Sequence, residues 1–296
     1  MLIVLGHWGC IIMADVALDY VVPGAALAPY VTLFYLFRAD VAEFEDVERA
    51  DHAQLRFRLS AGAAEYRFAD GRRVAAAANH FVGATSGAVH TRADGPLRVF
   101  GMGLTPAGWE ALTGIDAHAA LNQVIDAADR LGLVAADIAA ALDPCATAEE
   151  MAAIAEQRLG ALIGHGHAAT LGFVRTVDAW LVDGASPEIE ALVAQTGLSR
   201  RQVERRCNAL YGAPPKVLAR KYRALRAAVV LAEGQGEGGR CASDGFYDQS
   251  HMIREIKQFT GLTPRRIRDA PGELARLTIA QRRALEGRVA PIISNT

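Results

Sequence analysis

The sequence predicts an α+β protein, in which a β-rich N-terminal domain is followed by an all-α domain with two helix-turn-helix units. In the first half, Leu55, Phe57 and Leu59 alternate with Arg56 and Arg58, and this period of two is typical of a half-buried strand. In the second half, apolar residues recur at helical spacing, and one capped basic helix occurs twice. Strands followed by helices along the chain favour the α+β class.

Further strands are expected in the first half of the chain. Val31–Phe37 and Leu97–Leu104 are continuous apolar runs of strand length. Between them, Asp70 and Gly71 form a dipeptide that favours a tight hairpin turn, and apolar residues alternate with polar ones before it. The first half of the chain is therefore expected to consist mainly of short antiparallel strands.

Helices are expected from residue 105 onward. Thr105 is followed by proline and is expected to cap a helix that Gly114 ends. Asp116–Gly164 is rich in alanine and leucine, so we expect it to be mostly helical. Ala169–Gly184 carries one apolar face at helical spacing, and Ser186 is expected to cap the next helix.

The second half contains an internal repeat. Gly245–Pro264 has a good N-cap in Asp248 and an apolar stripe at helical spacing, and Gly197–Pro215 has the same layout with Ser199 as its cap. A shift of 49 residues superposes the two caps. The same shift pairs Val203 with Met252, Arg205 with Arg254, Cys207 with Ile256, Leu210 with Phe259, Gly212 with Gly261 and Pro215 with Pro264. A turn glycine followed by a capped basic helix is the second half of a helix-turn-helix.

These residues carry a family resemblance. Gly-Phe-x-Asp-Gln-Ser-His-Met-x-Arg-x-x-Lys from Gly245, followed by Gly-Leu-Thr-Pro-x-x-x-Arg at Gly261–Arg268, resembles the C-terminal signature of AraC/XylS-type transcriptional regulators. Gly197–Pro215 resembles the first helix-turn-helix of that family, and Lys216–Leu231 resembles its linker helix. The resemblance implies two recognition helices that enter successive major grooves on one side of a DNA duplex. For the strands in front, it implies a sensing and dimerising domain, a sandwich or cupin-like barrel.

The resemblance also implies which side chains contact DNA. In the first recognition helix the arginines can donate to guanine O6 and N7, and the glutamate can accept from the amino group of cytosine. The expected DNA-binding residues are Arg200, Arg201, Glu204, Arg205, Gln249, Ser250, Ile253 and Arg254. The expected phosphate contacts are Arg206, Lys216 and Lys257, and Arg200 is also better placed for a phosphate than for a base. The alternative for each arginine is that it only solubilises its helix.

The charge is distributed unevenly along the chain. Gly197–Arg268 holds 15 Lys and Arg against 6 Asp and Glu, whereas the rest of the chain holds 16 against 27. A net charge of −2 therefore hides a basic segment beside an acidic remainder. This asymmetry favours a polyanion partner for the basic segment, and a solvated charged face is the alternative.

The segment before the second recognition helix departs from the family pattern. Where the family has a supporting helix, Glu233–Asp244 contains four glycines, and each glycine weakens a helix by about 1 kcal/mol relative to alanine. Arg240 stands where the family has isoleucine or valine. We therefore expect the apolar support for Met252 and Ile256 to be largely missing, and the helix that follows Asp248 to be held loosely.

Nothing in the sequence predicts an enzyme, a cofactor or a metal site. No GxSxG, HExxH or Walker pattern is present, and the histidines are scattered. The only HxH pair, His165 and His167, lies in a glycine-containing linker, where surface polar residues are the simpler interpretation. Gly101 and Gly103 lack the third glycine and the helix of a nucleotide loop, so a β-bulge or close packing is expected there.

The cysteines and the N-terminal residues indicate the cellular compartment in which the protein is expected. The four cysteines are far apart and form no CxxC pair, which favours a reduced cytoplasmic protein. Met1–Ile12 is apolar but too short to span a bilayer, and it lacks the basic region of a signal peptide, so no membrane partner is expected. We expect Met13 to be the true start, which makes residues 1–13 a spurious extension; an interfacial anchor is the alternative.

The sequence therefore predicts a cytoplasmic, sequence-specific regulator of transcription that is not an enzyme. The expected domains are residues 14–164 for effector binding and dimerisation, 169–268 for DNA binding, and 269–296 as a helical tail. The expected partners are double-stranded DNA, a small-molecule effector, a second copy of the chain and, for an activator, RNA polymerase. One alternative is a ligand-binding protein whose second helix-turn-helix has decayed, with weak or no specific DNA binding. An enzyme in the β-rich domain is the third interpretation.

Overall fold

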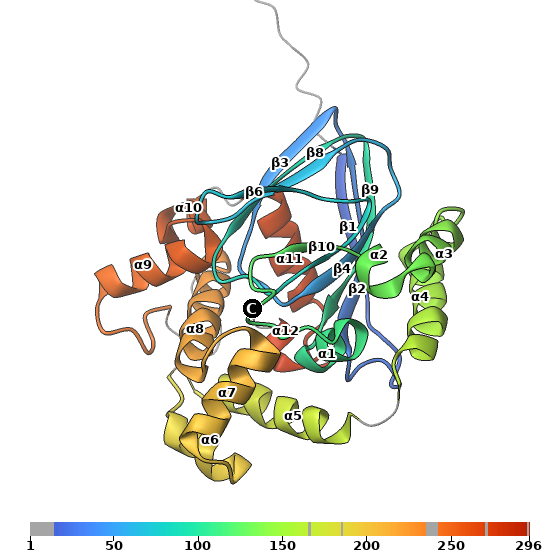
Figure 1. The fold of residues 1–296 in the computed structure, drawn as a ribbon. Coiled ribbons are helices and arrows are strands. Elements are labelled where there is room, and N and C mark those ends of the chain that lie inside the picture. Colours follow the sequence, from blue (N-terminus) through green and yellow to red (C-terminus); the bar gives the residue numbers. More distant parts are fainter. Residues whose placement is uncertain (1–14, 165–166, 185, 235–241, 270–271, 295) are drawn as a thin grey trace, which may run out of the picture.

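The computed structural model describes residues 15–164, 167–184, 186–234, 242–269, 272–294 and 296 (Figure 1). The expectations for Met1–Ile12, His165 and Arg240 lie outside these residues, as do those for the glycines at 236, 238 and 239. The first half of the chain forms two antiparallel sheets, and the alternation of apolar residues predicts strands there. A β-rich N-terminal half followed by a helical half confirms the α+β class.

The larger sheet has six strands in the order β1-β2-β9-β4-β7-β10, and the smaller has four in the order β3-β8-β5-β6. Their bounds are β1 Asp15–Val21, β2 Val31–Asp40, β3 Glu43–Glu48, β4 Gln54–Arg58, β5 Ala64–Arg67, β6 Arg73–Ala75, β7 Asn79–Val82, β8 Val89–Asp94, β9 Leu97–Leu104 and β10 Val124–Asp126. The two sheets pack through Phe37 and Leu97 on one side and Phe44 and Ala93 on the other. Antiparallel sheets that pack in this way form a sandwich.

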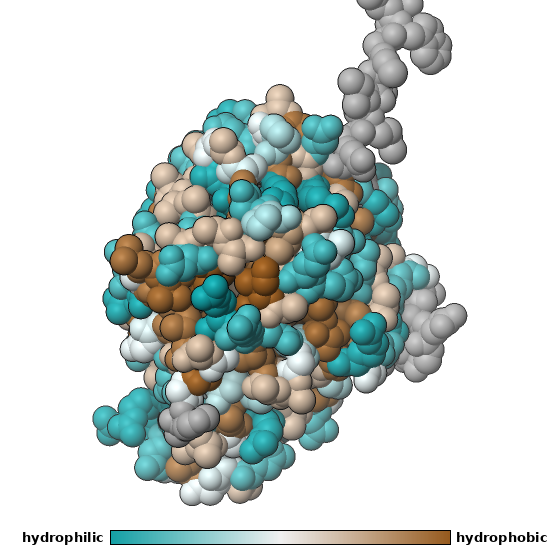
Figure 2. Space-filling model, turned by 90° about the vertical axis from the view of Figure 1, so that its right-hand side faces the viewer, coloured by the Kyte–Doolittle hydropathy of each residue, from teal (hydrophilic) through white to brown (hydrophobic). Residues whose placement is uncertain are grey.

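Helices cover the other face of the larger sheet. They are α1 Pro106–Thr113, α2 Ala128–Leu131, α3 Leu133–Leu142 and α4 Ala148–Leu162. Phe34, Phe57 and Phe100 of the sheet pack against Trp109 of α1 and Met151 of α4 in the main core of this half. Figure 2 shows the side that carries α3 and α4, where small hydrophobic patches alternate with hydrophilic ones. The predicted helix cap at residue 105 is confirmed, whereas the segment expected to be mostly helical also contains β10.

The first helix-turn-helix is formed by α6 Ile189–Thr196 and α7 Arg200–Tyr211. In front of it lies α5 Ala168–Val182, and the long α8 Pro215–Ala232 follows. Val177 and Trp180 of α5, Leu192 of α6, and Val203 and Cys207 of α7 are buried in one core. Helices α5 and α7 each bury one face at a spacing of three or four residues, as their sequences predict.

The predicted caps of this unit are partly right. Ser199 and Gln202 form the expected capping box, in which the Ser199 N–H donates to Oε1 of Gln202 over 2.9 Å. Ser186 does not cap α6, because the helix begins at Ile189 after Glu188. The hydroxyl of Ser186 instead accepts a hydrogen bond of 2.6 Å from Arg223, so a tertiary partner takes the place of the local one.

The second helix that the sequence predicts to be a recognition helix is α9, Gln249–Thr260, and its predicted cap and stop are both confirmed. After it come α10 Pro264–Asp269, α11 Glu273–Arg283 and α12 Pro291–Ser294. The tail returns to the body of the molecule: Leu274 and Leu277 of α11 pack against the sheets, and Ile292 packs into the core of the first helix-turn-helix. None of the helices in the described ranges is long and apolar enough to cross a membrane.

Candidate nucleic-acid interface and the cavity behind it

The outward face of α7 carries the residues expected to contact DNA. Arg200, Arg201 and Arg205 are exposed, and Glu204 is half-buried. Arg200 pairs with Glu190 of α6 over 3.2 Å and with Glu204 over 3.4 Å. Exposed pairs of this kind contribute little to stability and exchange readily for other partners. The arginines of this face are therefore available to a polyanion.

Burial of the opposite face determines which way these side chains point. Val203 and Cys207 are completely buried against α5 and α6, so the arginines must face solvent. Arg206 is different, because its guanidinium lies 4.4 Å from the ring centre of Phe173 and donates to the carbonyl of Ala169 over 3.4 Å. Lys216, at the start of α8, is exposed.

The outward face of α9 has a different composition. All five of its expected DNA contacts are exposed: Gln249, Ser250, Ile253, Arg254 and Lys257. On the opposite face, Ile256 and Phe259 are completely buried, and Met252 is half-buried. Each recognition helix thus brings its predicted base contacts together on its outward face, whereas Arg206 of α7 packs against Phe173.

The helix α8 holds the two recognition helices apart. Leu210 and Tyr211 of α7 share a core with Leu218 and Tyr222 in the first half of α8. The buried face of α9 packs instead against the second half, including Leu225, Ala228 and Leu231. The two recognition helices consequently lie at opposite ends of α8 (Figure 1).

A buried carboxylate fixes α9 to α8. Glu255 is only 1% exposed, and it accepts hydrogen bonds from Arg220 over 2.5 Å and from Arg223 over 2.7 Å. His251 lies 3.1 Å from the same carboxylate. Burial alone would raise the pKa of Glu255, but the two arginines hold this pKa below its usual value. Sequence reasoning missed this residue, because nothing in the local pattern connects Glu255 with arginines more than 30 positions away.

The end of α9 rests on the N-terminal half. The N–H of Ala50 donates to the carbonyl of Phe259 over 2.7 Å, and the N–H of Ala88 donates to the carbonyl of Gln258 over 3.1 Å. Gly261 has a φ of +74°, and a Cβ on it would lie 2.6 Å from Cγ1 of Val47. The sequence predicts that α9 lacks apolar support. This prediction is wrong, because Ile256 and Phe259 are completely buried. Support comes from α8 and from Ala50, which is completely buried in the same core.

The helix α8 is attached to the N-terminal half by buried polar groups. Lys221 donates through Nζ to the carbonyls of Asp51, over 2.8 Å, and Thr85, over 3.3 Å. The hydroxyl of Tyr222 lies 2.7 Å from Nε2 of His52. Burial lowers the pKa of Lys221 to about 8. These groups also went unnoticed in the sequence, since they join residues about 140 to 170 positions apart.

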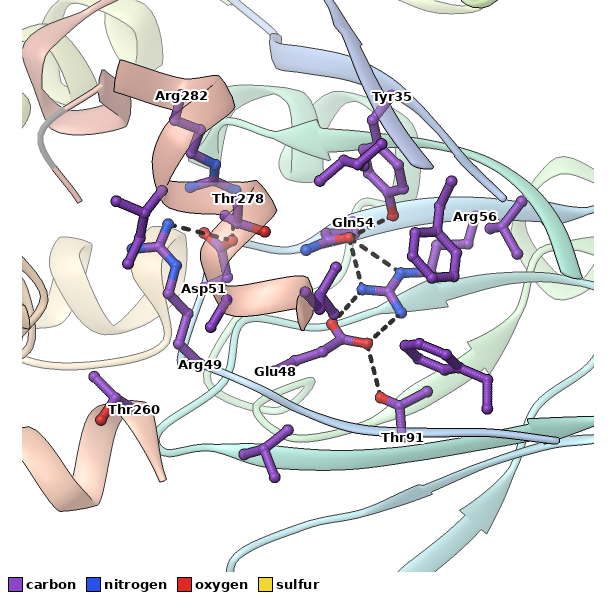
Figure 3. Close-up of a pocket in the computed structure, with 18 of the residues that line it drawn as sticks. Tyr35, Glu48, Arg49, Asp51, Gln54, Arg56, Thr91, Thr260, Thr278 and Arg282 are labelled. Atoms are coloured by element: carbon purple, nitrogen blue, oxygen red, sulfur yellow. Dashed lines mark hydrogen bonds and ion pairs between the residues drawn. The ribbon is translucent and has the colours of Figure 1, made fainter. Parts of the chain in front are cut away.

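A cavity of about 150 Å³ lies behind this junction (Figure 3). Its apolar wall comes from both sheets, from α8 and α11, and from the residues that follow α9. The apolar lining residues are Leu18, Phe37, Phe44, Leu97, Leu225, Val229, Leu262, Ile267, Leu274 and Ile279. The cavity therefore touches the N-terminal half and the second recognition unit at once.

Two groups of charged side chains project into the cavity. In one, Glu48 accepts two hydrogen bonds from Arg56, over 2.9 and 2.5 Å, and one from Thr91 over 2.7 Å (Figure 3). In the other, Asp51 accepts from Arg282 over 2.7 Å. In the part of the chain that the structure describes, no group of three His, Cys, Asp or Glu residues could hold a metal ion.

Comparison with known proteins identifies part of this architecture. A helix-turn-helix family of the AraC/XylS type matches residues 192–270, and a domain of unknown function (DUF6597) matches residues 20–126. The chain thus carries an AraC/XylS-type helix-turn-helix domain, and this domain supports a DNA-binding transcriptional regulator. AraC-type transcription regulators are not enzymes. No curated protein matches the chain.

Three solved structures are similar in part. An apo ToxT variant from Vibrio cholerae is 9% identical, with a TM-score of 0.41, over 76% of this chain and 96% of its own. A second ToxT structure from Vibrio cholerae is 8% identical, with a TM-score of 0.40, over 76% of this chain and 97% of its own. The AraC-like transcriptional activator CuxR is 15% identical, with a TM-score of 0.31, over 64% of this chain and 80% of its own.

Proposed function

We propose that this protein is a sequence-specific regulator of transcription, and that α7 and α9 enter successive major grooves of one DNA duplex. The observation that carries the proposal is the pair of capped helices at the two ends of α8, each with a buried apolar face and an exposed polar face. An α-helix fits the major groove, and the N-terminal half of a recognition helix meets the base edges.

The exposed residues of α7 suit a site that contains guanine and cytosine. Arg201 and Arg205 would each donate two hydrogen bonds to guanine, and Glu204 would accept from cytosine. Arg200 and Arg206, both already engaged with protein groups, are better placed for phosphates. Lys216 at the start of α8 would add a phosphate contact.

The exposed residues of α9 suit a more mixed site. Gln249 can form two hydrogen bonds with adenine, Arg254 can contact guanine, and Ser250 can bond to either kind of edge. Ile253 is an apolar side chain, 37% exposed on an otherwise polar face, and a thymine methyl group is its natural contact. Lys257 would contact a phosphate. The two helices would thus recognise different half-sites.

The test is selection of duplexes from a random pool by the full chain, followed by sequencing and a salt titration. We expect an enriched site with two half-sites about one helical turn apart. Log affinity should fall steeply with log salt concentration, because phosphate neutralisation releases counterions. A pool without enrichment would contradict sequence-specific binding, and an affinity that does not depend on salt would contradict DNA binding altogether.

We also propose that the protein divides into the three domains expected from the sequence, residues 14–164, 169–268 and 269–296, and that a ligand of the first domain modulates DNA binding. The supporting observation is the cavity between the sheets and the second recognition unit. Dimerisation and contact with RNA polymerase stay predictions. The complete burial of Ile256 and Phe259 favours DNA binding through both helix-turn-helix units over the alternative of a decayed second unit.

A further inference from the structure

Among the arginines that line the cavity, Arg49 has the least complete pairing, because Arg58 and Arg282 each leave only Nε buried without a hydrogen-bond partner among the described residues. Nε and Nη2 of Arg49 are buried and have no hydrogen-bond partner among the described residues. Its nearest carboxylate is Asp51, at 3.8 Å from Nη2. Asp51 already accepts from Arg282 over 2.7 Å and from the N–H of His52 over 2.9 Å. Arg49 therefore lies farther from this carboxylate than Arg282 and His52, which already occupy it.

The neighbouring arginine shows what full pairing looks like here. Arg56 forms a two-pronged pair with Glu48 and also donates to Gln54 and to the hydroxyl of Tyr66. Burying a charged group is costly unless it is paired and hydrogen-bonded. Arg49 does not have such a set of acceptors, and burial beside Arg282 lowers the pKa of Arg49 to about 10. Arg49 thus has a carboxylate at 3.8 Å but no hydrogen-bond acceptor for Nε or Nη2 among the described residues.

The charge balance of the cavity leads to the same conclusion. Among the described residues that line it, four are arginines and two are carboxylates, so positive charge is in excess by two. His80 does not add to this excess near pH 7, because burial lowers its pKa to about 4. Tyr35 and Tyr66 cannot offset it either, because burial raises the pKa of both phenols. An anionic ligand would reduce the imbalance.

The free edge of Arg49 indicates the kind of anion. Nε and Nη2 are the two donors on one edge of a guanidinium, and this edge matches the two oxygens of a carboxylate. Beside the charged and polar groups, the cavity has an apolar wall that includes Leu, Val, Ile and Phe side chains. A cavity of about this volume, 150 Å³, accommodates a molecule the size of benzene. The site thus combines one anion-binding edge with room for a small apolar body.

We propose that this cavity binds a small organic monoanion, a carboxylate whose apolar body is about the size of a benzene ring. Its carboxylate accepts hydrogen bonds from Nε and Nη2 of Arg49, and its body lies between the sheets and helices α8 and α11. The inference rests on the proposed function, since it gives the chemical class of the ligand that modulates DNA binding.

The position of the cavity lets a bound ligand affect the second recognition helix. Thr260 and Leu262, which end and follow α9, line the cavity, and Leu225 and Val229 line it from α8. A bound body therefore adds contacts on both sides of the junction that supports the second recognition helix. Occupancy should slow amide exchange in α9 at least about tenfold and leave α7 unchanged, because it opposes local opening only where it makes contact.

The test is calorimetric titration of the full chain, without DNA, using benzoate and cyclohexanecarboxylate with benzamide as the neutral analogue. We expect the acids to bind at least about tenfold more tightly than the amide, because a hydrogen bond to a charged group is worth about 1.5–3 kcal/mol. Arg49→Gln should weaken the acids by at least about tenfold. Arg38→Gln is the matched control, because Arg38 is exposed outside the cavity, and it should change nothing.

Three results would overturn the inference: neither acid saturates the protein at millimolar concentration, the amide binds as tightly as the acids, or Arg49→Gln binds as the parent does. If circular dichroism shows that Arg49→Gln is unfolded, the comparison of acid with amide on the unaltered chain still tests the inference. Selection of DNA duplexes by the protein is measured in a separate experiment, without any added carboxylate. Loss of acid binding with intact DNA selection removes this inference alone, whereas loss of DNA selection removes the proposed function.

Discussion

Both recognition helices contact the N-terminal half, α7 through a hydrogen bond from the N–H of Ala117 to the carbonyl of Ala209 and α9 through one from the N–H of Ala50 to the carbonyl of Phe259, but their apolar stripes are covered differently. Val203 and Cys207 of α7 are covered by α5 and α6. Ile256 and Phe259 of α9 are covered by α8 and by Ala50. The described residues between α8 and α9, 233–234 and 242–248, form turns and no helix.

This difference shows that a recognition helix needs an apolar surface against it but not a particular one. The apolar stripe of α9 would be unstable in water, and the fold covers it with whatever apolar surface is adjacent. The consequence is that the two units are coupled differently to the rest of the protein. The end of α9 contacts residues 47–51 and 85–88 of the N-terminal half, whereas the end of α7 contacts residues 117–121 of that half.

The largest expected effect comes from the carboxylate that fixes α9. Glu255→Ala should lower the free energy of unfolding by about 3–5 kcal/mol, because it leaves the buried guanidinium of Arg223 without its carboxylate partner. The matched change in the first unit, Glu204→Ala, removes an exposed pair and should cost about 0–1 kcal/mol. Urea denaturation of both variants measures the difference, and equal costs would contradict it.

The next effect concerns the two glycines that end α6 and α9. Gly261→Ala should cost about 2–4 kcal/mol, since it combines an unfavourable positive φ with a Cβ 2.6 Å from Val47. Gly197 has a similar φ of +65° but open space around it, so Gly197→Ala should cost only about 1–2 kcal/mol. Thermal or urea unfolding gives both values. A smaller cost at position 261 than at position 197 would show that α9 does not press on the N-terminal half.

A third effect separates base contacts from phosphate contacts in the first unit. Arg205→Ala should cost about 1–3 kcal/mol of binding free energy and relax the preference at one base pair. Lys216→Ala should weaken all sequences alike and reduce the salt dependence, because it removes at most one phosphate contact. Competition binding with the selected site and with random duplex measures both. Equal loss on both duplexes for Arg205→Ala would restrict its role to electrostatics.

The smallest effect is a pH dependence in the core of the first unit. Burial raises the pKa of Asp178 to about 6, although the hydroxyl of Tyr211 donates to it over 2.8 Å. The folded state thus prefers the protonated form, and its contribution to stability is complete below about pH 4 and lost as the pH rises through about 6. Asp178→Asn keeps an acceptor for Tyr211 and should be about 1–2 kcal/mol more stable than the parent above pH 7, with no difference near pH 4.

Unfolding curves of both proteins at pH 4, 6 and 8 check this dependence. The control is Asp183→Asn, because Asp183 is exposed just after the same helix. Its replacement should change stability by less than about 0.5 kcal/mol. A constant difference between Asp178→Asn and the parent at all three pH values would show that Asp178 stays ionised in the fold.

The bounds of the two recognition helices could be predicted from the sequence because the signals are local. Ser199 and Asp248 cap them, Gly212 and Gly261 end them, and the apolar residues between follow the helical period. Local signals gave a wrong prediction at Ser186. Serine is a favoured N-cap residue, but here its hydroxyl accepts a hydrogen bond from Arg223 instead of capping α6. A side chain with a strong tertiary partner cannot also serve a neighbouring helix.

The sequence by itself determined the class of the protein, the two capped helices and the faces that they expose, because caps and periodicity act over a few residues. Only the tertiary structure decided what covers the buried face of α9, which carboxylate pairs with Arg220 and Arg223, and that Nε and Nη2 of Arg49 have no hydrogen-bond partner among the described residues. These facts depend on contacts between residues more than 30 positions apart, or on the absence of a contact. A local pattern does not encode such pairings, since they arise only when the chain has folded.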